Sequence, residues 1–218
     1  MRRYYVDEFF LRYVHQLDAT RPVLDLGGHK FNKRGVFDID DYNLPVYYAN
    51  LVPQKGADIL ADAQDIPVAN NSFGTVICGE LLEHVPRPDL VLEQVYRVLQ
   101  SNGTLLITVP YLYQIHGDPY DYGRYTDYYW RENLTKLGFD TIHIEKQGLF
   151  WSVLIDMIRA RAHNRIKTEP RFKNWVERLV RRMKHYARKQ DAKPSIQEDK
   201  FFTSFTTGFG IIAKKPMS

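Results

Sequence analysis

The stretch "PYLYQIHGDPYDYGRYT", from Pro110 to Thr126, brings together side chains that can move a proton. His116 is the best base in it, because the pKa of an unperturbed imidazole lies near neutrality. Asp118 and Asp121 follow closely, and either could orient that imidazole or bind the hydroxyl groups of a substrate. The stretch therefore predicts a catalytic group made of His116, Asp118 and Asp121.

Three further side chains of this stretch could contact a substrate. Tyr122 and Tyr125 offer stacking surfaces, and Arg124 offers an anion contact. Two other interpretations stay open. The loop could be purely structural, held by its own aromatic rings with Arg124 paired to an acid. Alternatively, the histidine and the two aspartates could hold a divalent cation, but their spacing fixes no geometry, so we predict no metal.

A second stretch, "VLDLGGHK" at 23–30, is typical of the start of a nucleotide-binding loop. A short apolar run ends in Asp25, and glycines 27 and 28 let the backbone approach a ligand that a Cβ would exclude. The G-x-G-x-x-G pattern of dinucleotide folds is missing, as is the phosphate-loop lysine. His29 stands where a further glycine would be expected, which leaves the cofactor open at this point.

The elements that must position these residues are alternating strands and helices. Apolar runs bounded by turn residues predict strands at 22–26, 45–51, 57–60, 74–78, 103–109, 140–146 and 205–215. Helices are predicted near the N-terminus, from Pro88 to the Asn102-Gly103 pair, and over "WRENLTKLGF". This alternation predicts a mainly parallel sheet covered on both faces.

An ordered set of motifs resembles class I S-adenosylmethionine-dependent methyltransferases of the small type-11 kind. The motifs are "DLGG", "ADAQDIP", "NNSFGTVIC", "LLEHV" and "VLQSNG" before "LLITVP". The resemblance covers about 21–147 and resumes at 203–215. It implies a Rossmann-like, seven-stranded, mainly parallel sheet whose last strand inserts antiparallel beside strand five. We expect one domain over 1–218, with its core at about 1–147 and 203–215 and a helical insertion at about 150–192.

The resemblance also implies a site for S-adenosylmethionine. Asp25 and the two glycines would line its methionine and ribose part, and Asn50 aligns with the acid that holds the ribose hydroxyls. Asp62 would bind the adenine amino group, with the Ala63 backbone beside the ring. The cofactor-binding residues expected are Asp25, Gly27, Gly28, Asn50, Asp62, Ala63, Cys78, Gly79 and Glu80.

Several of these roles have plainer alternatives. Asp38 or Asp40 could replace Asn50, but we favour a loop-capping role for both. Asp62 could be a turn residue, and Cys78 is better interpreted as a small buried hydrophobe than as a nucleophile. His84 in "LEHV" could lie at the edge of the core or in the site.

The charge of the chain is uneven. Residues 156–194 carry 13 Lys/Arg against 4 Asp/Glu, whereas the whole chain has a net charge of only +4. A helical stripe runs along one face of this segment, and its members are Phe172, Trp175, Val176, Leu179, Val180, Met183 and Tyr186. We favour a helix packed on the core with a solvated basic face. Contact with an anionic membrane through about 150–190 comes next, and nucleic-acid binding is not expected.

The predicted function is methyl transfer to an oxygen of a glycan or another small acceptor. The arrangement "HGDPYDYGRYT" resembles methyltransferases that accompany cell-surface glycan assembly. One rival is a degenerate methyltransferase-like binding protein, suggested by His29 and Asn50. Another is an RNA methyltransferase, suggested by the basic segment but lacking an N/D-P-P-Y motif. The single cysteine and the absence of a long apolar run predict a cytoplasmic protein, peripheral to the inner membrane face if the basic segment binds lipid. The oligomeric state is left open.

Overall fold

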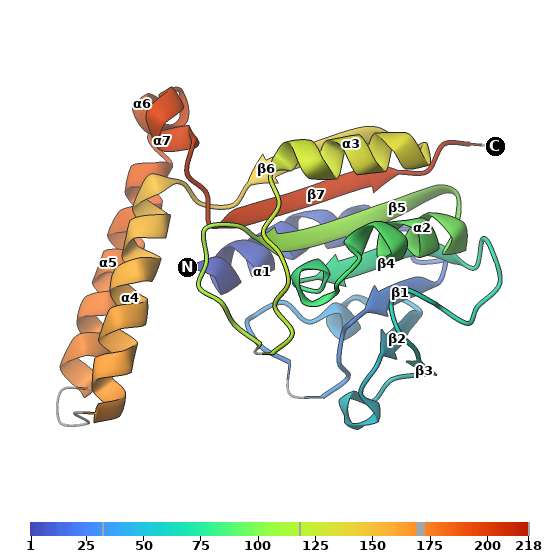
Figure 1. The fold of residues 1–218 in the computed structure, drawn as a ribbon, viewed down its shortest axis with the longest axis horizontal. Helices are drawn as coiled ribbons and strands as arrows, with labels where there is room; N and C mark the ends of the chain where they lie inside the picture. The colour runs from blue at the N-terminus through green and yellow to red at the C-terminus, as the bar shows by residue number, and fades with distance from the viewer. Residues whose placement is uncertain (32, 118, 169–172, 218) are drawn as a thin grey trace.

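Seven strands form one sheet in the computed structural model, which describes residues 1–31, 33–117, 119–168 and 173–217 (Figure 1). The strands run in the order β3-β2-β1-β4-β5-β7-β6. Their bounds are β1 Val23–Leu26, β2 Val46–Asn50, β3 Ile59–Leu60, β4 Phe73–Gly79, β5 Leu99–Pro110, β6 Asp140–Lys146 and β7 Gly208–Lys214. β7 pairs antiparallel with both β5 and β6, and the other ladders are parallel. The Rossmann-like fold of class I methyltransferases, expected from the motifs, is confirmed.

Helices cover both faces of this sheet, because successive strand residues point to opposite sides. One apolar cluster joins Leu24, Val76 and Ile107 to helices α2 (Pro88–Val98) and α3 (Asp127–Leu137). The alternate positions Val23, Ile77 and Leu106 belong to a second cluster. In that cluster Val6, Phe9 and Phe10 pack from helix α1 (Arg2–Tyr13), which is the helix expected at the N-terminus.

Helix α2 is shorter than predicted. Val91, Leu92, Val95 and Val98 are buried on one face, as the periodicity indicated. The helix ends at Val98 and not at the Asn102-Gly103 pair, because Leu99 already pairs with Phe73 in the sheet. Asn102 adopts a left-handed conformation, with φ 56°, inside the long strand β5.

The connection from β1 to β2 has little regular structure. In its described part, residues 27–45 without residue 32, the one helical element is the 3-10 helix η2 (Ile39–Tyr42). Asp38 caps η2 by accepting a hydrogen bond from the Asp40 backbone at 3.0 Å. The loop-capping role favoured for Asp38 is therefore confirmed. A dinucleotide fold would place a helix N-terminus here, and this chain places an irregular loop.

The insertion before β7 forms a helical hairpin. Helix α4 (Phe150–Thr168) and helix α5 (Lys173–Asp191) lie side by side and stand apart from the sheet, and the short helices α6 (Pro194–Gln197) and α7 (Lys200–Thr203) lead back to it (Figure 1). The Asp191 carboxylate accepts the Leu149, Trp151 and Ser152 backbone N–H groups at 3.0–3.1 Å. The last residue of α5 thus caps the first turn of α4.

The hairpin contains the longest helices, and neither meets the requirements for crossing a bilayer. Among the described residues, no helix is both long and apolar enough to span a membrane.

Candidate functional site

A cavity of about 740 Å³ opens at the carboxyl ends of β1, β2 and β4. Ligands of open α/β sheets collect at this edge. The cavity is lined by eight of the nine residues expected to bind the cofactor, namely Asp25, Gly27, Gly28, Asn50, Asp62, Ala63, Gly79 and Glu80. His116, from the loop after β5, lines the same cavity. Residues separated by up to 91 positions in the chain (25 to 116) therefore meet in one place.

The two glycines of the first loop are required by close contacts. Gly27 has φ 84°, and a Cβ there would lie 2.8 Å from the Leu81 Cδ1 atom. A Cβ on Gly28 would lie 2.2 Å from the Asp25 carboxyl carbon. The absence of a side chain at Gly28 leaves room for Asp25 under the turn, where burial raises the pKa of its carboxyl to about 7.

Asn50 holds this glycine turn in place. Its amide nitrogen donates to the carbonyl oxygens of Gly27 and Gly28, each at 2.9 Å. Its amide oxygen accepts the Val52 backbone N–H at 3.0 Å. A carboxylate has no hydrogen to donate to those two carbonyl groups, so the acid that the resemblance implies at this position could not make these two bonds.

Asp62 combines the turn role with a place in the cavity wall. Its Oδ1 atom accepts the Gln64 backbone N–H at 2.9 Å, and Ala63 beside it is buried. Cys78 departs from the expected site. Its neighbours Ile77 and Gly79 line the cavity, whereas the Cys78 side chain points to the opposite face and is fully buried in the core. Burial raises the pKa of this thiol well above its usual value, which fits the alternative of a small buried hydrophobe.

His29 also lines the cavity, so the departure from the glycine pattern lies directly at the site. Burial, and then the charges of Lys55 and Arg34, lower the pKa of its imidazole. Lys33 is on the same rim, where it donates to Asp38, to Asp40 at 2.6 Å and to the Tyr48 hydroxyl at 2.8 Å. Asp40 is therefore engaged away from the ribose role considered for it.

The loop after β5 is fixed by an ion pair. Arg124 donates to both carboxylate oxygens of Asp121, and this hydrogen bonding lowers the pKa of Asp121 to about 2. Asp121 also accepts the His116 backbone N–H at 2.7 Å, and its Oδ2 lies 3.4 Å from the His116 Nδ1 atom. These two contacts between Asp121 and His116 support the expected role of Asp121 in orienting the imidazole. Asp118 lies outside the described residues.

The three residues expected to contact substrate do not line the cavity. Arg124 also donates to the Gly123 carbonyl, so the alternative of an arginine paired to an acid describes it better than a free anion contact. Tyr125 stacks on Tyr129 with ring centroids 4.2 Å apart and packs against the core. Tyr122 is exposed.

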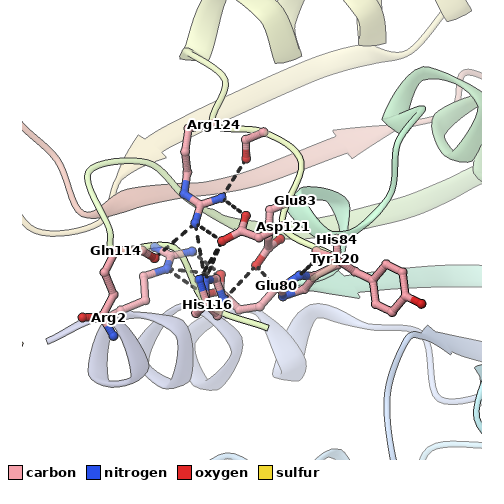
Figure 2. A network of polar contacts seen from close by, with 10 residues as sticks. Arg2, Glu80, Glu83, His84, Gln114, His116, Tyr120, Asp121 and Arg124 are labelled. Carbon is pink, nitrogen blue, oxygen red and sulfur yellow. Dashed lines mark hydrogen bonds and ion pairs between the residues drawn. The ribbon is translucent and has the colours of Figure 1, made fainter. Parts of the chain in front are cut away.

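Two acidic residues complete the site, and one of them was missed (Figure 2). Glu80 directly follows β4 in a left-handed conformation, with φ 53°, and pairs with Arg2 of α1 at 3.0 Å. Glu83, in "LLEHV", is 2% exposed, and its carboxylate oxygens accept no hydrogen bond. Burial, and then the charge of Glu80, raise the pKa of Glu83 to about 8. An acid inside an apolar run beside a histidine was the signal that could have identified it.

His84 follows Glu83 in the 3-10 helix η4 (Leu82–His84), and His116 approaches Glu83 from the loop after β5. The His84 Nε2 atom lies 3.7 Å from the Glu83 Oε1 atom, and the His116 Nε2 atom lies 3.6 Å from it. The two imidazole rings form an edge contact with centroids 4.8 Å apart. Burial, and then the neighbouring His84, lower the pKa of His116, so its imidazole is neutral near pH 7 and can accept a proton. His84 is thus a residue of the site.

Comparison with known proteins agrees with a methyltransferase. Residues 3–107 match the family described as "Methyltransferase domain". A curated relative is the ubiquinone/menaquinone biosynthesis C-methyltransferase UbiE of Rhizobium meliloti, 31% identical over 91 residues. That match covers 42% of this chain and 29% of the relative, so the shared stretch is a minor part of the relative's length.

Solved structures resemble the chain over nearly all of its length. A SAM-dependent methyltransferase from Archaeoglobus fulgidus has a TM-score of 0.61 at 15% identity, covering 98% of this chain and 94% of that one. A phosphoethanolamine N-methyltransferase 2 from Haemonchus contortus, solved with phosphomonomethylethanolamine and S-adenosylhomocysteine, has a TM-score of 0.60 at 18% identity. The superposition covers 97% of this chain and 52% of the Haemonchus contortus chain. At such identities the likeness establishes the fold.

Proposed function

We propose that the protein is an S-adenosylmethionine-dependent methyltransferase that acts on an oxygen atom of a glycan or another small-molecule acceptor. The observation that carries this proposal is the cavity of about 740 Å³ that joins the Asp25 and Gly27-Gly28 turn to His116. The cofactor would lie along the strand ends, with its methionine part by Asp25 and its adenine by Asp62. The bound cofactor supplies a methyl group on a positively charged sulfur.

The residues of the chain supply alignment and proton transfer. Methyl transfer is an in-line displacement, so the acceptor atom must face the sulfur–carbon bond from the far side. A hydroxyl acceptor must also lose its proton, and His116 is the neutral imidazole that lines the cavity. UbiE is named as a C-methyltransferase and the Haemonchus contortus enzyme as an N-methyltransferase. The choice of oxygen therefore depends on His116 and on the resemblance of its loop to glycan-associated enzymes.

The helical hairpin would bring the protein to its acceptor. On α5, Trp175 is 65% exposed and Leu179 is 41% exposed, and Met157 of α4 is 61% exposed. Met183 instead packs against Met1 and Ile155. The predicted stripe is thus divided between core and solvent, while Phe172 and the Val176 side chain lie outside the described parts. The proposal includes that the surface around Met157, Trp175 and Leu179 contacts anionic lipid and brings a lipid-linked acceptor to the cavity.

Cofactor titration followed by a turnover assay tests the proposal. S-adenosylhomocysteine should raise the thermal midpoint, because it binds the folded state alone, and Asp62→Ala should weaken that response. His116→Ala should lower the rate of methyl transfer to glycan acceptors far more than it lowers cofactor affinity. His143→Ala, at an exposed position of β6, is the matched control.

Two results would contradict the proposal. Absence of binding at millimolar S-adenosylhomocysteine would indicate the degenerate binding protein. Binding without transfer to any glycan or small hydroxyl compound, together with salt-sensitive binding of RNA, would indicate the RNA methyltransferase.

A further inference from the structure

We propose that Glu83, His84 and His116 bind a divalent first-row transition-metal cation, such as Zn²⁺, at the acceptor end of the cavity. One donor atom from each of the three residues lies within 4.8 Å of the other two. Both histidines line the cavity, so the cation would have an open side facing it. The binding itself is independent of the proposed function, but the reason for a cation there rests on it.

The first support is the state of the Glu83 carboxyl group. It is 2% exposed and neither oxygen accepts a hydrogen bond. Arg2 and Arg124, the neighbouring cations, are bonded to Glu80 and Asp121 instead. A buried carboxyl group without a partner is costly, and it requires a proton or a cation to satisfy it.

The second support is the separation of the donor atoms. The two Nε2 atoms lie 3.7 Å and 3.6 Å from Glu83 Oε1. These distances are too long for hydrogen bonds. They are close to the roughly 3.4 Å that separates ligand atoms around a tetrahedral cation with bonds of about 2.1 Å. Small rotations of the two imidazole rings would complete the coordination.

The third support is the orientation of the His84 imidazole ring. The His84 Nδ1 atom lies 2.6 Å from the Tyr120 carbonyl oxygen, which can only accept a hydrogen bond. Nδ1 therefore carries the hydrogen, and Nε2 keeps its lone pair toward Glu83. The His116 Nδ1 atom lies 3.4 Å from the Asp121 Oδ2 atom and also 3.4 Å from the Arg124 Nη2 atom, so these contacts fix the tautomer of His84 alone. Metal-binding histidines commonly have such a carbonyl or carboxylate partner on their other nitrogen.

Two imidazoles and one carboxylate with an open side are the donor set of catalytic zinc sites and of related first-row metal sites. The arrangement suits an acceptor with a hydroxyl group. Its oxygen would bind the cation, and its proton would leave to water. The new carbon–oxygen bond would form as the carbon–sulfur bond breaks, with the electron pair returning to sulfur. His116 would then be a ligand, and the cation would promote the loss of the proton that His116 was expected to accept.

Metal titration of the full chain without cofactor or acceptor tests the proposal. After treatment with a chelator, the protein should bind one equivalent of Zn²⁺ by calorimetry. Co²⁺ should give the visible absorption of a low-symmetry site with nitrogen ligands. Glu83→Gln, which keeps the side-chain shape, and His84→Ala should each weaken Zn²⁺ binding by about tenfold or more. His143→Ala should bind Zn²⁺ like the wild type.

The controls separate this proposal from the preceding one. Glu83→Gln should fold, because an amide has nearly the same shape as the carboxyl group and no hydrogen bond to Glu83 is lost. It should retain S-adenosylhomocysteine binding, since Glu83 is not part of the cavity lining. The metal site is wrong if the wild type binds no Zn²⁺, or if Glu83→Gln binds it equally well. If the wild type does not bind S-adenosylhomocysteine, the proposed methyltransferase function is wrong. The Zn²⁺ titration would still test the metal site independently.

Discussion

At the scale of single residues, the Asn50 side-chain amide stabilises the glycine turn of the expected cofactor site. The family resemblance of the sequence implies an acid at this position for the ribose, and on that basis Asn50→Asp would be expected to restore cofactor affinity. The contacts with the Gly27 and Gly28 carbonyl oxygens predict the opposite, because a carboxylate would lose both hydrogen bonds and face two acceptors. We expect a loss of about 2 kcal/mol of stability and weaker S-adenosylhomocysteine binding.

Calorimetry and thermal unfolding at pH 8 measure both effects. Asn70→Asp is the control, since Asn70 is exposed and accepts a hydrogen bond from Arg97, a role that aspartate keeps. Tighter cofactor binding by Asn50→Asp would show that the ribose contact dominates at this position.

Residues of the site differed in how well they could be predicted. Asp25 lies in strand β1, the two glycines follow it directly, and together they form a local pattern that the sequence shows. Eight members of the expected cofactor set accordingly line the cavity. Glu83 has no such pattern, because its isolation depends on Arg2 and Arg124 being bonded to other acids. The Arg2–Glu80 pair joins residues 78 positions apart, which no local spacing encodes.

At the scale of elements, the hairpin depends on a cap from its own far end. Asp191→Ala would leave three backbone N–H groups at the start of α4 without their acceptor, in a buried place. We expect a loss of about 2–3 kcal/mol of stability and faster hydrogen exchange at the start of α4. Cofactor binding should persist, because the cavity is built from the other end of the chain.

Asp199→Ala provides the matched comparison for Asp191→Ala. Asp199 caps the short helix α7 through one bond to the Phe201 backbone, at an exposed position. Its removal should cost under about 1 kcal/mol. Equal losses in the two variants would mean that the Asp191 bonds contribute no more than a surface cap.

Elements were predicted best where burial decides them. All seven strands were expected within a few residues, because each is an apolar run bounded by turn residues. The early end of α2 was not, since the pairing of Leu99 with Phe73 overrides the local helix-ending signal of Asn102-Gly103. In the described part of the connection from β1 to β2 there is no α-helix, and the broken glycine pattern was the signal in the sequence for this departure.

At the scale of the whole molecule, charge and apolar exposure coincide on the hairpin. Residues 156–194 carry 13 Lys/Arg against 4 Asp/Glu. A second cavity, of about 650 Å³, lies between the hairpin and α1 and is lined by Arg159, Arg181, Lys184 and Arg188 among others. Each basic residue near an anionic bilayer contributes about 1 kcal/mol of attraction, which salt weakens.

Vesicle co-sedimentation tests this attraction. The wild type should bind vesicles that contain anionic lipid in low salt. The triple variant Arg178→Glu, Arg181→Glu and Arg182→Glu should lose this binding and keep its affinity for S-adenosylhomocysteine. The control replaces Arg131, Lys136 and Lys214, which are exposed on α3 and β7, with Glu to give the same change in net charge. An equal loss of vesicle binding in both triple variants would indicate an effect of net charge. Absence of vesicle binding by the wild type would mean that the hairpin has no role in membrane binding.

The position of β7 has a consequence for how the chain is made. β6 reaches the sheet through β7, which stands between β5 and β6. During synthesis, β1 to β5 and the cavity they carry leave the ribosome well before residues 208–214 do. The edge of β5 therefore remains unpaired until β7 emerges. Strand β6, with the hairpin that follows it, also lacks its partner until β7 pairs with both strands. Chaperone binding to nascent chains should accordingly be strongest after β5 is made and should end once β7 is released.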